Sequence, residues 1–232
     1  MKTATGVTLI HNGQLFNAAA LLVDGAFCER FEVLGRGHAE RLLPMVREVL
    51  AEGGVALGAL DAIAFGRGPG GFTGLRIAAG VTQGLAFGAG LPVVPVSDLA
   101  ALAARAAALN AARHVVACLD ARMAQVYWAP FDCADPAAPI ALGEESVADP
   151  ETVRLPDGAE RWFGAGHGFA GYPALRAMLG ARLTACDQEL LPQAREIALL
   201  GAAAFAAGRA VAAEQAVPVY LRDQVAHRKG QR

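Results

Sequence analysis

GRGPGGFTGLR, residues 66–76, contains five glycines, one proline and no carboxylate, and it lies between two apolar segments. Glycine at this density lets the backbone come close to another group, because no Cβ stands in the way. The apolar run 60–65 before this loop predicts a short buried strand, and residues 73–88 after it predict a helix. Loops between a strand and a helix are where α/β proteins bind phosphate on free N–H groups. The stretch therefore predicts an α/β fold whose glycine loop contacts either a phosphate or another piece of protein.

The loop departs from both common phosphate-binding motifs. Gly66 and Gly71 have the spacing of the P-loop glycines, but Phe72 stands where that motif requires lysine. The dinucleotide pattern G-x-G-x-x-G begins at Gly66 and Gly68, yet bulky Phe72 follows Gly71, and no acidic residue lies about 20 positions further on. A tight turn from a strand into a closely packed helix explains the glycines at least as well as a nucleotide site does.

The helix predicted after the loop carries a second glycine pattern. Gly80, Gly84 and Gly88 recur every four residues, so they lie roughly on one helix face. Each of them costs about 1 kcal/mol relative to alanine in a helix interior. Three on one face predict that a neighbour approaches the backbone closely. That neighbour is either the sheet of this chain or a helix of a partner, and the spacing alone does not separate the two.

Hairpin signals followed by strand–helix alternation occur twice along the chain. The first series comprises a hairpin at 18–33 with the turn Asp24-Gly25, a helix at 36–54, the elements around the glycine loop, a strand at 91–96, and a helix from Ser97 or Asp98 to about 108. The second comprises strand, turn and strand over 114–131, a strand at 160–166, and helices at 173–179 and 193–207. This order predicts two α/β halves, residues 1–108 and 109–232, with the C-terminal helix at about 193–215 packing back on the first half.

The composition is that of a globular protein, because 54% of the residues are hydrophobic and 18% are charged. The formal net charge of −2 provides no overall basic field that would recruit nucleic acid. Only residues 222–232 are locally basic, and we interpret them as a solvated end of the chain. Four widely spaced cysteines and no secretory signal predict reduced thiols in a cytoplasmic protein. The glycines and prolines within 77–96 favour buried core over a membrane span.

Six stretches carry a resemblance to one known family: RGHAERLLPMV (36–46), AFGRGPGGFTGLRIAAGVTQGLAFG (64–88), VPVSDLAALA (94–103), LDARMAQVYWAPF (119–131), FGAG (163–166) and PVYLRDQVA (218–226). They closely resemble the TsaB family, which takes part in the biosynthesis of N6-threonylcarbamoyladenosine in bacterial tRNA. The likeness covers nearly the whole chain from Ala18, and the run around the glycine loop is highly specific to that family. It implies a two-lobed actin-like ATPase fold, which is ribonuclease H-like, with a degenerate nucleotide site.

The resemblance also implies how such a chain works. It implies a non-catalytic subunit that dimerises with its catalytic paralogue TsaD through two helices of the N-terminal half. An ATPase, TsaE, joins the complex, tRNA is contacted indirectly, and the isolated subunit closes the same surface by forming a homodimer. The residues expected at this partner interface are His38, Leu42, Leu43, Val46, Gly80, Gly84 and Gly88.

The sequence supplies no recognisable metal site, and no cofactor is expected. TsaD-type proteins carry the motif H-x-x-x-H where this chain has Asp98 and Leu102, and an aspartate and a leucine cannot replace a histidine pair. The five histidines are scattered, and H-E-x-x-H is absent, so a metal-dependent hydrolase ranks last among the functions considered. His38 is interpreted as a helix cap or surface contact rather than a base.

Nucleotide binding is the alternative that the sequence leaves open. Phosphate sites of this superfamily use one aspartate in each half, and Asp120 is either such a contact or a turn former. In the first half, His11 and Asn12 stand where the family has Asp-Thr, which indicates a weak first strand or an altered start over residues 1–17. Thr73 and Arg76 are further candidates for an anion contact. An active small-molecule kinase or ATPase of the same superfamily is therefore the rival to the accessory subunit.

Overall fold

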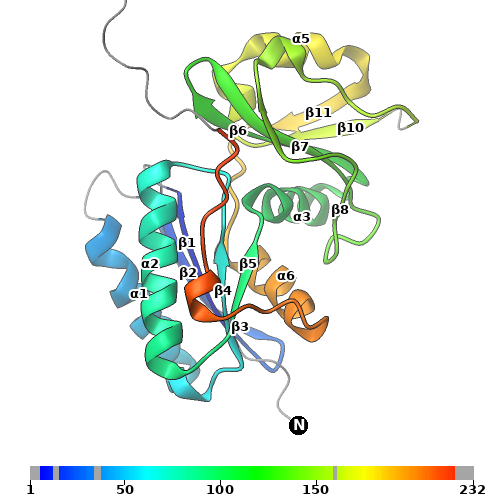
Figure 1. Ribbon diagram of the computed structural model, residues 1–232. Helices are drawn as coiled ribbons and strands as arrows, with labels where there is room; N and C mark the ends of the chain where they lie inside the picture. The colour runs from blue at the N-terminus through cyan, green and yellow to red at the C-terminus, as the bar shows by residue number, and fades with distance from the viewer. Residues whose placement is uncertain (1–5, 13–15, 34–37, 159–160, 223–232) are drawn as a thin grey trace, which may run out of the picture.

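The structure is a computed structural model that describes residues 6–12, 16–33, 38–158 and 161–222, with only the backbone described for 6–12 and for residue 38. It contains two mixed sheets, one above the other, with helices on both faces of each (Figure 1). The described residues also form four single-turn 3-10 helices, at Leu57–Ala59, Pro150–Thr152, Gly180–Arg182 and Ala213–Gln215 (η1 to η4). None of the described helices combines the length and the apolar character that crossing a bilayer requires.

The first sheet has the strand order β3-β2-β1-β4-β5. Its strands are β1 (Gly6–Asn12), β2 (Phe16–Val23), β3 (Ala26–Val33), β4 (Ala62–Gly66) and β5 (Val93–Val96). The first three are antiparallel neighbours, while β4 and β5 continue parallel to β1. The hairpin predicted at Asp24-Gly25 is confirmed, and both turn residues have positive φ. The expectation of a weak first strand is wrong, because β1 pairs along its length with β2 and also with β4.

Helices cover the two faces of this sheet. On one face lie α1 (His38–Gly53) and α2 (Phe72–Ala89), side by side in Figure 1. On the other face, α6 (Ala194–Ala206) packs Ile197 against the alanine-rich side of β2 and β4. The helices predicted at 36–54, 73–88 and 193–207 form within two residues at each end. The longer bound of about 215 for the last helix is wrong, because α6 ends at Ala206 and the separate turn η4 follows.

The second sheet repeats the plan of the first. Its order is β11-β10-β6-β7-β8. The central strand β6 has the antiparallel strand β7 on one side and the parallel strands β10 and β11 on the other. The strands are β6 (His114–Arg122), β7 (Gln125–Asp132), β8 (Ile140–Ala141), β10 (Trp162–Ala165) and β11 (Leu183–Asp187), and β9 (Ser146–Ala148) also pairs with β7. This repeated order confirms the predicted actin-like, ribonuclease H-like α/β fold.

Helix α3 (Asp98–Asn110) lies between the two sheets. Its Leu99 and Leu102 pack in the core of the second sheet, whereas its Ala101 packs against the first. The short helices α4 (Gly168–Gly171) and α5 (Pro173–Leu179) cover the far face of the second sheet. The division of the chain into halves at residue 108 stays a prediction, since α3 belongs by its contacts to both.

The first part of the glycine loop between β4 and α2 packs against other segments of the chain, whereas Gly71, Phe72 and Thr73 are exposed. A Cβ at Gly66 would collide with the carboxylate of Asp98. Gly68 has a φ of +104°, and a Cβ there would lie 3.2 Å from the carbonyl oxygen of Val219. The loop therefore needs glycine for close packing and for a left-handed backbone, which favours the turn interpretation over a phosphate cradle.

Candidate partner interface

The outer face of α2 carries the glycine pattern and is open. The helix buries Leu75, Ala78 and Ala86 against the sheet. Gly80, Gly84 and Gly88 are exposed, and a Cβ built on any of them would meet no other atom within 4 Å. The sheet of this chain is therefore not the neighbour that the glycines accommodate, and the described chain leaves the stripe uncovered.

Phe87 adds a large apolar side chain to the same face, and our sequence reasoning missed it. Its side chain is 82% exposed. It follows Gly80 by seven residues and Gly84 by three, so the three positions share one side of the helix. The signal was present in the sequence, but a phenylalanine in an apolar helix is normally assigned to the core. The glycine stripe and Phe87 of α2, together with the exposed Leu43 of α1 on the same side of the first sheet, are called the α1–α2 surface below.

Helix α1 corrects part of the predicted interface. Leu42 and Val46 are 0% and 2% exposed, and they pack on Leu21 of the sheet, so the expectation that they face a partner is wrong. They were selected by helical periodicity, and that periodicity marks the face which the sheet of this chain covers. Leu43, between them, is 40% exposed and does face outward. His38 begins α1, but its side chain lies outside the described part of the structure.

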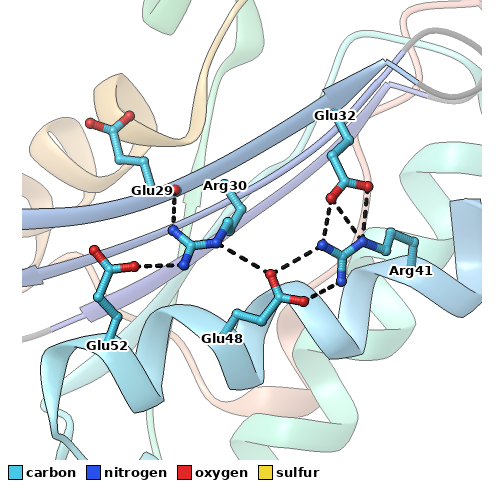
Figure 2. A network of polar contacts seen from close by, with 6 residues as sticks. All are labelled: Glu29, Arg30, Glu32, Arg41, Glu48 and Glu52. Carbon is cyan, nitrogen blue, oxygen red and sulfur yellow. Dashed lines mark hydrogen bonds and ion pairs between the residues drawn. The ribbon is translucent and has the colours of Figure 1, made fainter.

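A network of charged side chains holds the flank of α1 against strand β3 (Figure 2). The Arg41 guanidinium donates to both oxygens of Glu32, at 2.9 and 2.8 Å from Nε, and also to Glu48. Arg30 bridges Glu48 and Glu52, at 3.2 and 2.6 Å. Hydrogen bonds from Arg41 lower the pKa of both Glu32 and Glu48. The network therefore fixes the position of α1 while leaving its Leu43 side free.

The candidate anion contacts at the start of α2 are engaged with this chain. The Arg76 guanidinium lies 3.8 Å from the centroid of the Phe72 ring, and its Nε donates to the Tyr220 hydroxyl at 3.0 Å. Thr73, on the first turn, is exposed. A stacked and hydrogen-bonded arginine has fewer donors left for an anion. An anion contact by Thr73 and Arg76 stays a prediction.

Asp120 lies on the other sheet, at the end of β6, and its contacts favour the turn interpretation. Its Oδ1 accepts the backbone N–H of Arg122 at 2.8 Å and the Tyr172 hydroxyl at 2.9 Å. An aspartate that accepts the N–H two residues ahead stabilises a tight turn. Burial, together with the hydrogen bond to Asp120, raises the pKa of Tyr172. The same oxygen thus already has two donors within the chain.

The positions of the TsaD-type histidine pair are buried. Asp98 is 2% exposed and Leu102 is 0% exposed, so neither side chain reaches a solvent-filled site. Burial raises the pKa of Asp98 to about 8, although Arg67 lowers it in part. Its Oδ1 is buried without a hydrogen-bond partner, beside an ion pair of 3.1 Å between Arg67 and Glu145. Within the part of the chain that the structure describes, no group of three or more His, Cys, Asp or Glu side chains could hold a metal ion.

Known proteins resemble this chain over most of its length. Residues 32–230 match the protein-family model described as "TsaD: tRNA N6-adenosine threonylcarbamoyltransferase". A protein of Escherichia coli K12 named "tRNA threonylcarbamoyladenosine biosynthesis protein TsaB" is 41% identical over 215 residues, which cover 91% of this chain and 92% of that protein. The Haemophilus influenzae protein of the same name is 37% identical over 219 residues, 91% of each chain.

A solved structure agrees with these sequence relatives. The structure titled "YeaZ from Pseudomonas aeruginosa" superposes with a TM-score of 0.88 at 47% identity, over 94% of this chain and all of that one. The family model is named for the transferase, whereas the relatives that align end to end carry the TsaB name. The chain belongs to the TsaB family.

Proposed function

We propose that this chain is a non-catalytic subunit needed to form N6-threonylcarbamoyladenosine at position 37 of tRNAs that read ANN codons. It acts by dimerising with a catalytic paralogue of the TsaD type and by supporting the binding of a TsaE-type ATPase. The names of the E. coli and H. influenzae relatives support the pathway. The TsaD description of the matching family model supports a common fold with the transferase. The complex works in the cytoplasm, and this subunit contacts tRNA only indirectly.

The observation that carries the proposal is the uncovered glycine stripe of α2. Each exposed glycine costs the helix about 1 kcal/mol relative to alanine, and no described atom of this chain uses the space at Gly80, Gly84 or Gly88. A helix of a partner that packs there can approach more closely than the usual 8–10 Å between helix axes. Phe87 supplies apolar area on the stripe's side of α2, and the exposed Leu43 of α1 adds a second apolar side chain to the α1–α2 surface. Aromatic anchors of this kind dominate the energy of many protein interfaces.

The buried Asp98 and Leu102 support a non-catalytic role. A metal-dependent transferase needs ligands that reach its substrate, and here the two corresponding side chains are enclosed in the core. The catalytic chemistry would then belong to the paralogue. A homodimer formed through the α1–α2 surface would compete with the heterodimer, because one surface cannot serve two partners at once.

The interface is tested with Gly84→Leu. Leucine is a better helix former than glycine, and there is room for it, so the isolated chain should stay folded and become slightly more stable. Co-purification with the TsaD-type paralogue should be lost. The matched control is Ala203→Leu, which adds a similar side chain to an exposed position of α6, away from the α1–α2 surface. Pairing of the Gly84 variant at the strength of the unmodified chain would refute the interface.

The role itself is tested by reconstitution. Threonylcarbamoyl transfer to tRNA is measured with the TsaD-type and TsaE-type proteins and the carbamoyl-adenylate synthase, with and without this chain. We expect transfer to depend on this chain and to be lost with Gly84→Leu but not with Ala203→Leu. Transfer that proceeds equally without the chain would remove the proposed function.

A further inference from the structure

The segment after η4 runs across both halves of the molecule. Residues 216–222, called the strap below, leave η4 beside α2 and reach the second sheet at the turn between β6 and β7 (Figure 1). The strap has no regular secondary structure. Its position is therefore set by contacts with other elements, and those contacts occur at both of its ends.

The first part of the strap is bound to α2 and to the glycine loop through the backbone. Gln83 of α2 donates to the carbonyl oxygen of Ala216 at 3.1 Å. The backbone N–H of Val219 donates to the carbonyl oxygen of Arg67 at 2.8 Å. The carbonyl oxygen of Val219 lies against Gly68, where a Cβ would have too little room. The strap thus packs against the glycine loop through Val219.

Tyr220 joins the strap to the outer face of α2. Its hydroxyl accepts from Arg76 at 3.0 Å, and its ring centroid lies 5.4 Å from that of Phe72. Arg76 is exposed and precedes Gly80 by four residues, so it extends the glycine stripe toward the start of the helix. A molecule that covers the α1–α2 surface would therefore lie beside the Arg76–Tyr220 contact.

The far end of the strap holds a strained turn. Arg222 donates to the Gln125 side chain at 2.6 Å, to the Arg122 carbonyl oxygen at 3.5 Å and to the Met123 sulfur at 3.1 Å. Arg122, Met123 and Ala124 all have positive φ, of 62°, 52° and 58°. Three consecutive non-glycine residues in this region are unfavourable and persist only where the surroundings hold them. The hydrogen bonds from Arg222 supply part of the interactions that stabilise this turn.

We propose that the strap is a relay that couples the outer face of α2 to the β6–β7 turn. Val219, which binds the glycine loop, and Arg222, which binds the turn, are three residues apart, and residues 219–222 line one small pocket together with Gly70, Phe72 and Tyr127, so a shift of the strap at one contact should displace the other. Because three residues of positive φ depend on their surroundings, loss of the Arg222 hydrogen bonds should let the turn open more often. The coupling within the chain is independent of any partner, whereas its use by a partner rests on the proposed function.

Hydrogen exchange measured by mass spectrometry on the full chain tests the coupling. Tyr220→Phe removes the hydroxyl that Arg76 binds but keeps the ring, and it should speed exchange in residues 122–126 about fivefold, the effect of one lost hydrogen bond. Arg222→Ala should do the same for residues 67–76 at the opposite end. Arg209→Ala, at an exposed position outside the strap, should change neither region. Unchanged exchange at residues 122–126 in Tyr220→Phe, or at residues 67–76 in Arg222→Ala, would overturn the relay.

A second arm adds the TsaD-type paralogue to the unmodified chain. If the paralogue binds, exchange in residues 122–126 should change together with exchange in α2, and Tyr220→Phe should abolish the change at 122–126 alone. Binding with no change at the turn would overturn the use of the relay by a partner while leaving the proposed function intact. Failure to bind would contradict the proposed function, and the first arm would still decide the coupling within the chain.

Discussion

The carboxylate of Asp98 packs directly against the Cα of Gly66, with no room between them for a side chain. The first glycine of the loop is thus required by an acid at the start of α3, about 30 residues further along the chain. Gly66 pairs with Val96 of β5, and Asp98 begins α3 two residues later, so the contact lies where α3 leaves the first sheet. It also gives a packing reason for glycine at position 66 that requires no phosphate.

Gly66→Ala should destabilise the protein by about 1–3 kcal/mol, since the added methyl group must displace a buried carboxylate. Gly80→Ala is the matched control on the open face of α2. There the methyl group meets nothing, and the substitution should stabilise by roughly 0.5–1 kcal/mol. Urea unfolding followed by circular dichroism measures both. Equal effects of the two substitutions would contradict the packing described for the loop.

Asp98 should make stability fall as the pH rises from 6 to about 8. Burial raises its pKa in the folded protein to about 8, whereas an unfolded chain has an aspartate pKa of about 3.9. The folded state therefore keeps a proton that the unfolded state has lost. The contribution of Asp98 to the free energy of unfolding is fully present below the pKa of the unfolded state. It disappears as the pH approaches the pKa of the folded state. Unfolding free energies at pH 6, 7 and 8 measure the slope.

Asp98→Asn should remove that contribution to the slope, because the amide does not titrate. The comparison between the two proteins isolates Asp98 from other groups that titrate in the same range. An unchanged pH dependence in the asparagine variant would show that Asp98 does not hold the proton.

Phe87→Ala should weaken binding of the TsaD-type paralogue by about 2 kcal/mol, the size expected for an exposed aromatic anchor that becomes buried on binding. The stability of the isolated chain should hardly change, because the side chain is 82% exposed. Titration calorimetry and thermal unfolding give the two quantities. Phe31→Ala, on strand β3 outside the α1–α2 surface, is the control and should leave binding unchanged. A Phe87 variant that binds like the unmodified chain would exclude it from the interface.

The network around Arg41 should contribute stability that is lost on acidification. Arg41 lowers the pKa of Glu32 and Glu48 in the folded state, so this contribution is present above the unfolded pKa of glutamate and disappears as the pH falls through the folded values. Arg41→Met should lower the midpoint of thermal unfolding at pH 7 more than at pH 3. Arg47→Met, at an exposed position of the same helix, is the control and should lack that difference. A pH-independent effect at Arg41 would assign it to packing instead.

The isolated chain should show no saturable heat when titrated with ATP and magnesium. The strap lies over the glycine loop, and Asp120 already accepts two hydrogen bonds within the chain. A single carboxylate without a counterpart in the other half binds magnesium phosphate poorly. Asp120→Asn tests the assignment, since it should leave the titration unchanged. Tight binding of ATP and magnesium that is lost in Asp120→Asn would support the rival hypothesis of a kinase or ATPase.

Sequence reasoning worked best where a local pattern has one structural meaning. The Asp24-Gly25 turn, the helix that Pro173 begins and the cap at Ser97 all lie where they were predicted. It failed at Leu42 and Val46, because apolar periodicity identifies the buried face of a helix but does not say what buries it. The first strand was predicted to be weak for a related reason. Strand pairing with β2 and β4 stabilises β1, and such pairing is not encoded in its own residues.

The sequence by itself determined the fold class, the family and the lack of a histidine pair, since these depend on residue types and their spacing. Tertiary structure decided which glycines serve the interior and which remain open. The residue type does not distinguish Gly66 from Gly84. A Cβ at Gly66 would collide with Asp98, whereas a Cβ at Gly84 would have no neighbour within 4 Å. The reason is that close approach involves residues far apart in the chain. Only the folded arrangement brings Val219 to the glycine loop and leaves Gly80, Gly84 and Gly88 of α2 uncovered.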